Sequence, residues 1–418
     1  MTHAHDSDIA ATRRSPATGG GDVDELRAVV GPTPRSGHGE CFIWKSGTDV
    51  VAVDAGGAGP VGRHAGQHRP HILILSHDDN DHIRGAVSLI VAAGDQLREL
   101  WVPAEWAILV KQLADSSPDA MLPQDDGLVN IRDVETELGS WLSELRQEEE
   151  FTAGQLRATI SSAELTLAAW TTAGSSAGDG FRLVDESGSF RQWYGAKDLA
   201  EILDRVRKRA KPLLAIFSAT LAQGLRIKFF SIDRALARGG TPWMTAGQPG
   251  VATFANALEA PHALAVRMPP GLPRTYALTR ITVQNRRALC SLLWRAPHTP
   301  DNGVLIWSDT DGNWLDHLAP SAVTQLAKSL SATSAPHHAS GNSAHDRVWQ
   351  TLARARADLV MISAGGQKNQ SYRADYDVLA ARRCCTWCRP NHPAYQEVVA
   401  ISAGKRAMQL KTTCLVQH

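Results

Sequence analysis

Short apolar runs separated by turn residues form the first clear pattern along the chain. They cover residues 26–30, 41–44 and 49–53, with Gly, Ser and Pro between them. Runs of this length and spacing predict antiparallel β-strands. An apolar segment at 86–93, ended by Gly94, predicts a packed helix, and residues 100–103 predict the next strand. The N-terminal part is therefore expected to combine a sheet with a helix.

The C-terminal part repeats the strand pattern. Residues 276–285, 289–294 and 303–307 are strand candidates. Between them and the N-terminal part, residues 106–113, 134–145 and 197–209 have helical periodicity, and 156–167 fit either a strand or a helix. Residues 331–346, rich in Ser, Ala and His, predict a mobile loop in which His337 and His338 belong to a solvent-exposed linker.

These patterns predict the domain organisation. Residues 1–22 are rich in Ala, Thr, Ser, Asp and Gly, which predicts a flexible tail. Residues 23–418 are expected to form one domain, and about 104–275 an insertion or cap within it.

The most informative stretch is the polar segment that follows the apolar run 72–75. It contains His77, Asp79, Asp81 and His82, which are four possible metal ligands. In an extended loop His77, Asp79 and Asp81 project to one side because alternate side chains share a side, and His82 is left for a second ion. The alternative is a set of solvated charges in a surface turn. A buried strand delivering all four favours the metal site.

A second apolar strand, 303–307, also ends in carboxylates. Asp309 follows it after Ser308. Two apolar strands thus end in carboxylate-bearing loops.

The segment from His77 to His82, followed by Gly85, resembles the signature of the metallo-β-lactamase fold, His-x-His-x-Asp-His at the end of a core strand, with Asp79 in place of the second His. It is most similar to the metallo-β-lactamase-like domain of competence proteins that act in DNA uptake. The resemblance implies an α/β (α+β) fold, a four-layer αββα sandwich with a long internal insertion. It places Asp54 beneath the metal loop, either capping a tight turn or orienting a ligand histidine.

The resemblance also implies a ligand set. His77 and Asp79 would hold one metal, Asp81 and His82 the second, and Asp309 both, so that Asp309 would meet the other four residues in one cleft. The family usually has a His pair where this chain has Ala364 and Gly365. His392, in a Pro-bracketed turn, is the expected substitute as the final ligand of a second site that is otherwise incomplete.

The implied activity is that of a hydrolase in which a metal-bound hydroxide attacks a phosphodiester, so that the substrate would be a nucleic acid or nucleotide. Asp81, His82 and Asp309 would be its catalytic residues. Zinc is the expected metal, and the carboxylate of Asp79 also permits manganese or iron. Two alternatives remain open: a scaffold or regulatory protein that kept the fold and lost the chemistry, and a diiron oxidoreductase.

The composition of the chain limits how it could bind nucleic acid or a membrane. Lys plus Arg and Asp plus Glu number 43 each, so nucleic-acid binding must come from a local patch. The basic run 205–209 either contacts phosphates or is a solvated helix face. No apolar stretch reaches the roughly 20 residues of a membrane span, and the N-terminus lacks the features of a secretory signal, so a cytoplasmic location without membrane contact is expected.

Overall fold

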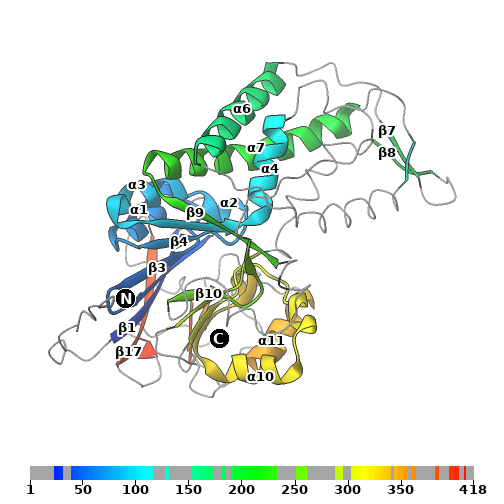
Figure 1. Ribbon diagram of the computed structural model, residues 1–418. Helices are drawn as coiled ribbons and strands as arrows, with labels where there is room; N and C mark the ends of the chain where they lie inside the picture. Colours follow the sequence, from blue (N-terminus) through cyan, green and yellow to red (C-terminus); the bar gives the residue numbers. More distant parts are fainter. Residues whose placement is uncertain are drawn as a thin grey trace, which may run out of the picture.

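A computed structural model gives the three-dimensional structure of the chain (Figure 1). Several predictions, for residues 1–22, 134–145, 276–285, 364–365 and 392, lie outside the described residues. The described residues are 23–31, 39–115, 128–130, 153–172, 181–184, 190–194, 196–232, 235, 251–260, 288–294, 303–339, 343–355, 360–363, 382–385, 395–403 and 409–410.

A large mixed sheet contains the N-terminal strands. Among the described residues it has nine strands in the order β11-β9-β5-β4-β3-β2-β1-β17-β18. The predicted antiparallel start is confirmed, since β1 pairs with β2 and β2 with β3, whereas β3, β4, β5 and β9 run parallel. The strands are β1 (Val23–Val30), β2 (Glu40–Ser46), β3 (Asp49–Val53), β4 (Ile72–Ile74), β5 (Glu99–Pro103), β9 (Arg226–Ser231), β11 (Leu258–Ala260), β17 (Gln396–Ala403) and β18 (Gln409–Leu410).

A second sheet contains most of the C-terminal strands. Its described strands have the order β10-β12-β13-β14-β15-β16, and β13 to β16 run parallel. They are β10 (Ala252–Phe254), β12 (Ser291–Leu293), β13 (Gly303–Ile306), β14 (Leu330–Ser334), β15 (Val360–Ser363) and β16 (Arg382–Cys385). A small separate sheet holds β6 (Leu128–Asn130), β7 (Phe181–Val184) and β8 (Phe190–Tyr194). The chain is therefore a mixed α/β protein.

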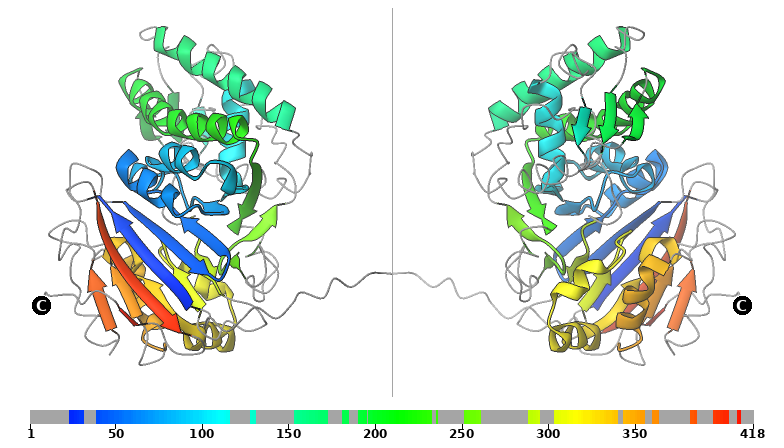
Figure 2. Two further views of the ribbon diagram at one scale, coloured as in Figure 1. Left: turned by 90° about the vertical axis from the view of Figure 1, so that its left-hand side faces the viewer. Right: turned by 90° about the vertical axis from the view of Figure 1, so that its right-hand side faces the viewer.

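Alternating side chains of the large sheet face two different cores. On β2, Cys41 and Ile43 face a cluster shared with helices, whereas Phe42 and Trp44 face a cluster shared with the second sheet. The strands read as continuous apolar runs because both of their faces are buried. Helices thus pack on one face of the large sheet, and the second sheet packs on its other face, as Figures 1 and 2 show.

The helices lie on the outer faces of the two sheets. The large sheet is covered by α1 (Gly59–Gln67) and α3 (Ala86–Ala93), with α4 (Ala104–Asp115), α6 (Ala153–Thr172) and α7 (Ala196–Ala222) beyond them. The second sheet is covered by α10 (Pro320–Ser329) and α11 (Asp346–Leu352). No helix among the described residues is long and apolar enough to cross a membrane.

Two sequence predictions need correction here. The stretch 104–275 is not an insertion throughout, because β9 and β11 pair within the large sheet and β10 within the second. These strands are short, and the alternation of apolar and polar residues along them is too weak to predict a strand. The predicted mobile loop at 331–346 is also wrong: it contains most of β14, then the 3-10 turns η7 (Pro336–Ala339) and η8 (Ser343–His345) and the start of α11.

Candidate metal centre

His77 is delivered by β4, which is buried at every position. The chain continues through Leu75 and Ser76, and the His77 side chain is 3% exposed. Its Nδ1 lies 2.9 Å from the Ser76 hydroxyl, so Nε2 is left to face the neighbouring polar residues. That Nε2 is buried and has no hydrogen-bond partner in the described part of the chain.

The following residues do not form the extended loop that the sequence suggested. Residues Asn80–Ile83 form a single helical turn, α2, with Asp79 as its N-cap. The prediction that alternate side chains share one side is therefore wrong beyond Asp79. The helical turn buries His82 and leaves Asp81 half-buried.

Asp309 lies at the meeting point of these residues. It follows β13, and Ser308 before it has a left-handed backbone, with φ of 53°. The buried carboxylate has Oδ2 3.5 Å from Nε2 of His77 and Oδ1 3.2 Å from Nε2 of His82. The structure thus brings together residues that are more than 200 positions apart in the chain.

His338 is a site residue that the sequence analysis placed in an exposed linker. That interpretation is wrong, because the His338 side chain is 3% exposed and its Nε2 lies 3.1 Å from Oδ2 of Asp81 and 3.6 Å from Oδ1 of Asp309. The same atom lies 3.2 Å from Nε2 of His82. His338 follows the strand β14 as His77 follows β4, but β14 is not an apolar run, so the sequence contains no such signal for His338.

The turn that carries His338 has an unusual backbone. His337, His338 and Ala339 all have positive φ, at 43°, 51° and 64°. Left-handed residues other than Gly cost free energy and persist where surrounding contacts hold them, often at functional sites. Here they turn both imidazoles toward Asp309, whose Oδ2 is 3.3 Å from Nε2 of His337.

Two groups of side chains in this centre could hold a metal ion. One is His77, His82 and Asp309, all buried, and the other is Asp81, His82 and His338. The donor set of imidazole and carboxylate suits zinc, manganese and iron. Oδ1 of Asp309 and Nε2 of His77 are buried and have ion-pair contacts but no hydrogen bond in the described residues, and a cation would satisfy both atoms. The residues present therefore fit a metal centre, whose metal the structure does not identify.

The charges of this cluster are strongly coupled. Burial opposes ionisation of Asp309, but the positive charges of His82 and His338 outweigh it and hold its pKa well below the usual range. Burial also disfavours charge on His338, whereas Asp309, Asp81 and Glu40 raise its pKa to about 10. His338 thus carries a proton in the metal-free protein at neutral pH. Burial opposes charge on His82 as well, but Asp309, Asp54 and Asp81 raise its pKa well above the usual value, so His82 is also protonated. A metal must displace these protons to bind.

Asp54 supports the centre from below. It accepts hydrogen bonds from Nδ1 of His82 at 2.8 Å and from the backbone nitrogen and hydroxyl of Ser76 at 2.8 and 2.9 Å. The Ser308 hydroxyl donates to the same carboxylate at 3.2 Å. Asp54 therefore fixes the ring of His82 and joins loops from both sheets, which is the orienting role that the sequence left open beside a turn cap.

Glu40 has the corresponding position beside His338. Its Oε1 lies 3.4 Å from Nδ1 of His338, and the carboxyl group is buried. Burial raises the pKa of Glu40, and His338 opposes that rise. Sequence reasoning missed this residue, although an acid directly before the apolar run Cys41–Trp44 was a usable signal.

Asp79 lies at the rim, outside both groups. Its Oδ2 is 3.8 Å from Nε2 of His77, and its Oδ1 is 3.6 Å from a guanidinium nitrogen of Arg209. Arg209 comes from α7 and also lies 3.5 Å from the buried Asp78. Part of the basic run at 205–209 therefore contacts the metal loop, whereas Lys208 beside it is exposed. His392, predicted as a ligand, lies outside the described residues.

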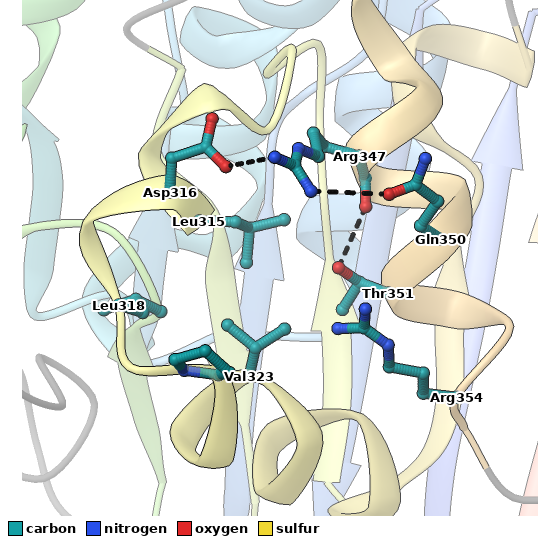
Figure 3. Close-up of a pocket in the computed structure, with 9 residues that line it drawn as sticks. Leu315, Asp316, Leu318, Val323, Arg347, Gln350, Thr351 and Arg354 are labelled. Carbon is teal, nitrogen blue, oxygen red and sulfur yellow. Dashed lines mark hydrogen bonds and ion pairs between the residues drawn. The ribbon is translucent and has the colours of Figure 1, made fainter.

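A pocket elsewhere in the molecule is separate from this centre. It has a volume of about 200 Å³ and lies between α10, α11 and the 3-10 turn η6 (Asn313–His317) (Figure 3). Arg347 points into it and pairs with Asp316 at 3.1 Å. None of its lining residues belongs to the histidine groups.

Comparison with known proteins does not assign the chain to a family. No protein-family model matches the sequence, and no curated protein matches it either.

Proposed function

We propose that this protein is a metal-dependent hydrolase of the metallo-β-lactamase type that cleaves phosphodiester bonds. The observation that carries the proposal is the position of Asp309, whose carboxylate oxygens lie within 3.6 Å of nitrogen atoms of His77, His82 and His338. A buried carboxylate surrounded by imidazoles from two loops, His77 and His82 after β4 and His338 after β14, suits the shared ligand of two ions.

Three buried hydrophobic clusters of the described residues, each between two neighbouring layers, support a four-layer αββα sandwich of this fold type. Buried clusters join helices to the large sheet, the two sheets to each other, and the second sheet to α10 and α11. The candidate ligands follow strands of both sheets at one end of the sandwich, where hydrogen bonds such as Leu289 N to Ser76 O, at 2.9 Å, join the sheets.

The ligand roles follow from the two groups. His77 and Asp309 would hold one ion, with Asp79 close enough to join them, and Asp81, His82 and His338 would hold the other, with Asp309 shared. Bound divalent ions lower the pKa of a water molecule and stabilise the charge that develops in the transition state. Asp54 and Glu40 orient the rings of His82 and His338 through their Nδ1 atoms.

Arg209 supports a phosphate-containing substrate. Its guanidinium group is about a third exposed beside Asp79, at the rim of the centre. A planar guanidinium suits the bidentate recognition of phosphate oxygens. Arg209 would therefore bind a non-reacting oxygen of the phosphodiester.

The position of His338 argues against the alternative of a scaffold or regulatory protein that has lost its catalytic activity. That alternative depends on Ala364 and Gly365 standing where the family has its His pair, and His338 supplies a buried imidazole to the second group. The carboxylate of Asp79 still allows iron, so metal identity must be measured and not assumed.

The test is metal content together with hydrolysis of bis(p-nitrophenyl) phosphate by the full chain. We expect about two equivalents of divalent metal, and we expect Asp309→Asn and His338→Ala each to reduce hydrolysis about 100-fold or more, since each removes several kcal/mol of metal and charge stabilisation. His317→Ala is the control because His317 is exposed and belongs to neither group.

Two outcomes would reject the proposal. One is a metal-loaded protein that shows no hydrolysis of this or any other phosphodiester. The other is unchanged activity in Asp309→Asn. Iron content with redox activity would favour the oxidoreductase alternative.

A further inference from the structure

A second cluster of possible metal ligands lies outside the candidate centre. His64 and His68 are at the C-terminal end of α1, and Glu397 is on β17. Their ligand atoms all lie within 4.8 Å of one another. Residues 64 and 397 are more than 300 positions apart, so the fold and not local sequence brings them together.

The helix places both histidines on one side. Positions i and i+4 are neighbours on a helix surface, a spacing at which two imidazoles can share one zinc ion. Nε2 of His64 lies 2.8 Å from Oε2 of Glu397. The two rings lie edge to face, with centroids 5.1 Å apart.

Neighbouring side chains hold two of the three groups in place. The ring of Tyr395 stacks on His64, with centroids 3.9 Å apart and 16° between the planes. Arg27 pairs with Oε1 of Glu397, the oxygen that does not face His64, and with Glu25. Oε2 is therefore directed at the histidines, in the way that outer partners orient metal ligands.

An ion pair between His64 and Glu397 explains part of this cluster but not His68. Nε2 of His68 is buried and has no hydrogen-bond partner within the described residues. A buried nitrogen left without a hydrogen-bond partner destabilises the fold, and a bound cation would remove that cost. Burial, together with the positive charge of Arg27, lowers the pKa of His68, so the ring is neutral and its nitrogen can act as a ligand.

We propose that His64, His68 and Glu397 form an additional metal site that binds a zinc-class divalent cation. Two imidazoles and one carboxylate are a known zinc ligand set, in which water takes the fourth position. The local charges favour a cation, since the two carboxylates Glu25 and Glu397 outnumber the one guanidinium group of Arg27. The ion joins α1 to β17 and so fastens a helix early in the chain to a strand near its C-terminal end.

The site is tested by zinc binding to the full chain in which the centre is disabled by Asp309→Asn and His338→Ala. We expect one zinc to remain bound and to raise the melting temperature. Adding His68→Ala should lower zinc affinity at least about 10-fold, because loss of a ligand costs no less than loss of an orienting partner. It should also abolish the zinc-dependent rise in melting temperature.

His68→Ala is the informative change because it removes a side chain whose Nε2 makes no hydrogen bond in the described residues, so the fold is expected to survive. His317→Ala, an exposed histidine outside the cluster, is the matched control and should bind zinc as before. His68→Cys should retain Co²⁺ and add a thiolate-to-cobalt absorption band, which identifies residue 68 as a ligand.

Equal zinc affinity with and without His68→Ala would overturn the proposal, as would a cobalt spectrum unaltered by His68→Cys. Because the centre is disabled throughout, these outcomes do not depend on hydrolysis. The additional site and the proposed activity can therefore fail separately.

Discussion

His338 lies among three carboxylates, and its charge therefore affects the stability of the metal-free protein. Its pKa is about 10 in the folded state, against about 6.5 in an unfolded chain. Because the folded pKa is raised, this contribution to stability is fully present below about pH 6.5 and is lost as the pH rises through about 10. We predict that the free energy of unfolding of the chelator-treated protein falls by a few kcal/mol over this window. Urea unfolding at a series of pH values measures it.

The comparison variant is His338→Asn, which keeps a polar side chain but cannot take up the proton. Its unfolding free energy should change less between pH 7 and pH 10 than that of the unaltered protein. Parallel pH profiles for the two proteins would contradict the assignment of the proton to His338. Metal-loaded protein should lack this slope, since the metal replaces the proton.

At the scale of residues, His77 and Asp309 could be predicted as strand-end ligands because apolar strands precede them. His338 could not be found in that way, because β14 consists largely of Ser, Thr and Ala. Those hydroxyl groups are buried but satisfied: Thr333 donates to the Leu305 carbonyl at 2.9 Å, and the Ser334 hydroxyl accepts from Trp307 N at 2.9 Å. A strand that buries polar side chains against a neighbouring strand loses the apolar signal on which sequence patterns depend.

At the scale of elements, α1 and the turn before α3 approach so closely that only glycine fits. A Cβ added to Gly62 would lie 2.0 Å from the carbonyl oxygen of Gly85. We predict that Gly62→Ala lowers the free energy of unfolding by about 1–3 kcal/mol, even though Ala favours a helix by about 1 kcal/mol over Gly. Chemical denaturation measures the change.

Gly59→Ala is the matched control on the same helix. The nearest atom to its added Cβ is the Ser88 hydroxyl at 3.2 Å, which can rotate away. Its unfolding free energy should stay within about 1 kcal/mol of the original value. Gly85 follows α2, so Gly62→Ala should also weaken metal binding at His82. A Gly62→Ala protein as stable as Gly59→Ala would disprove the close-packing argument.

Element prediction succeeded where one periodicity held over the whole segment. The strands β1 to β3, the helix α3 and the strand β5 follow the expected ranges, because each is bounded by Gly or Pro or by a change of pattern. β10 and β11 were not found. Each has three residues, and their pairing with β12 and β9 depends on contacts distant in sequence.

At the scale of the molecule, the candidate centre exists only where the two sheets meet. Asp54, His77 and His82 belong to loops of the large sheet, whereas Asp309 and His338 follow strands of the second. Neither sheet carries a complete group, since Asp309 or His338 is needed in each. Metal binding should therefore stabilise the packing of one sheet against the other.

The helical part of the molecule reaches this centre through Arg209 of α7. Its guanidinium group lies 3.5 Å from the buried carboxyl group of Asp78. Burial raises the pKa of Asp78, and the positive charge of Arg209 offsets only part of that rise. Removing the cation leaves a buried carboxylate without its compensating charge, which costs about 1–3 kcal/mol. We predict a loss of this size for Arg209→Ala, measured by urea unfolding at neutral pH.

Asp78→Asn separates this ion pair from simple packing. In the Arg209→Ala protein, Asp78→Asn should recover much of the lost stability, because it removes the charge that was left unpaired. The four proteins form a double-mutant cycle, whose coupling energy should exceed about 0.5 kcal/mol for residues in contact. Lys211→Ala is the control, since Lys211 is exposed on the same helix. If Arg209→Ala costs no more than Lys211→Ala, or if the cycle shows no coupling, α7 does not hold the metal loop through this pair.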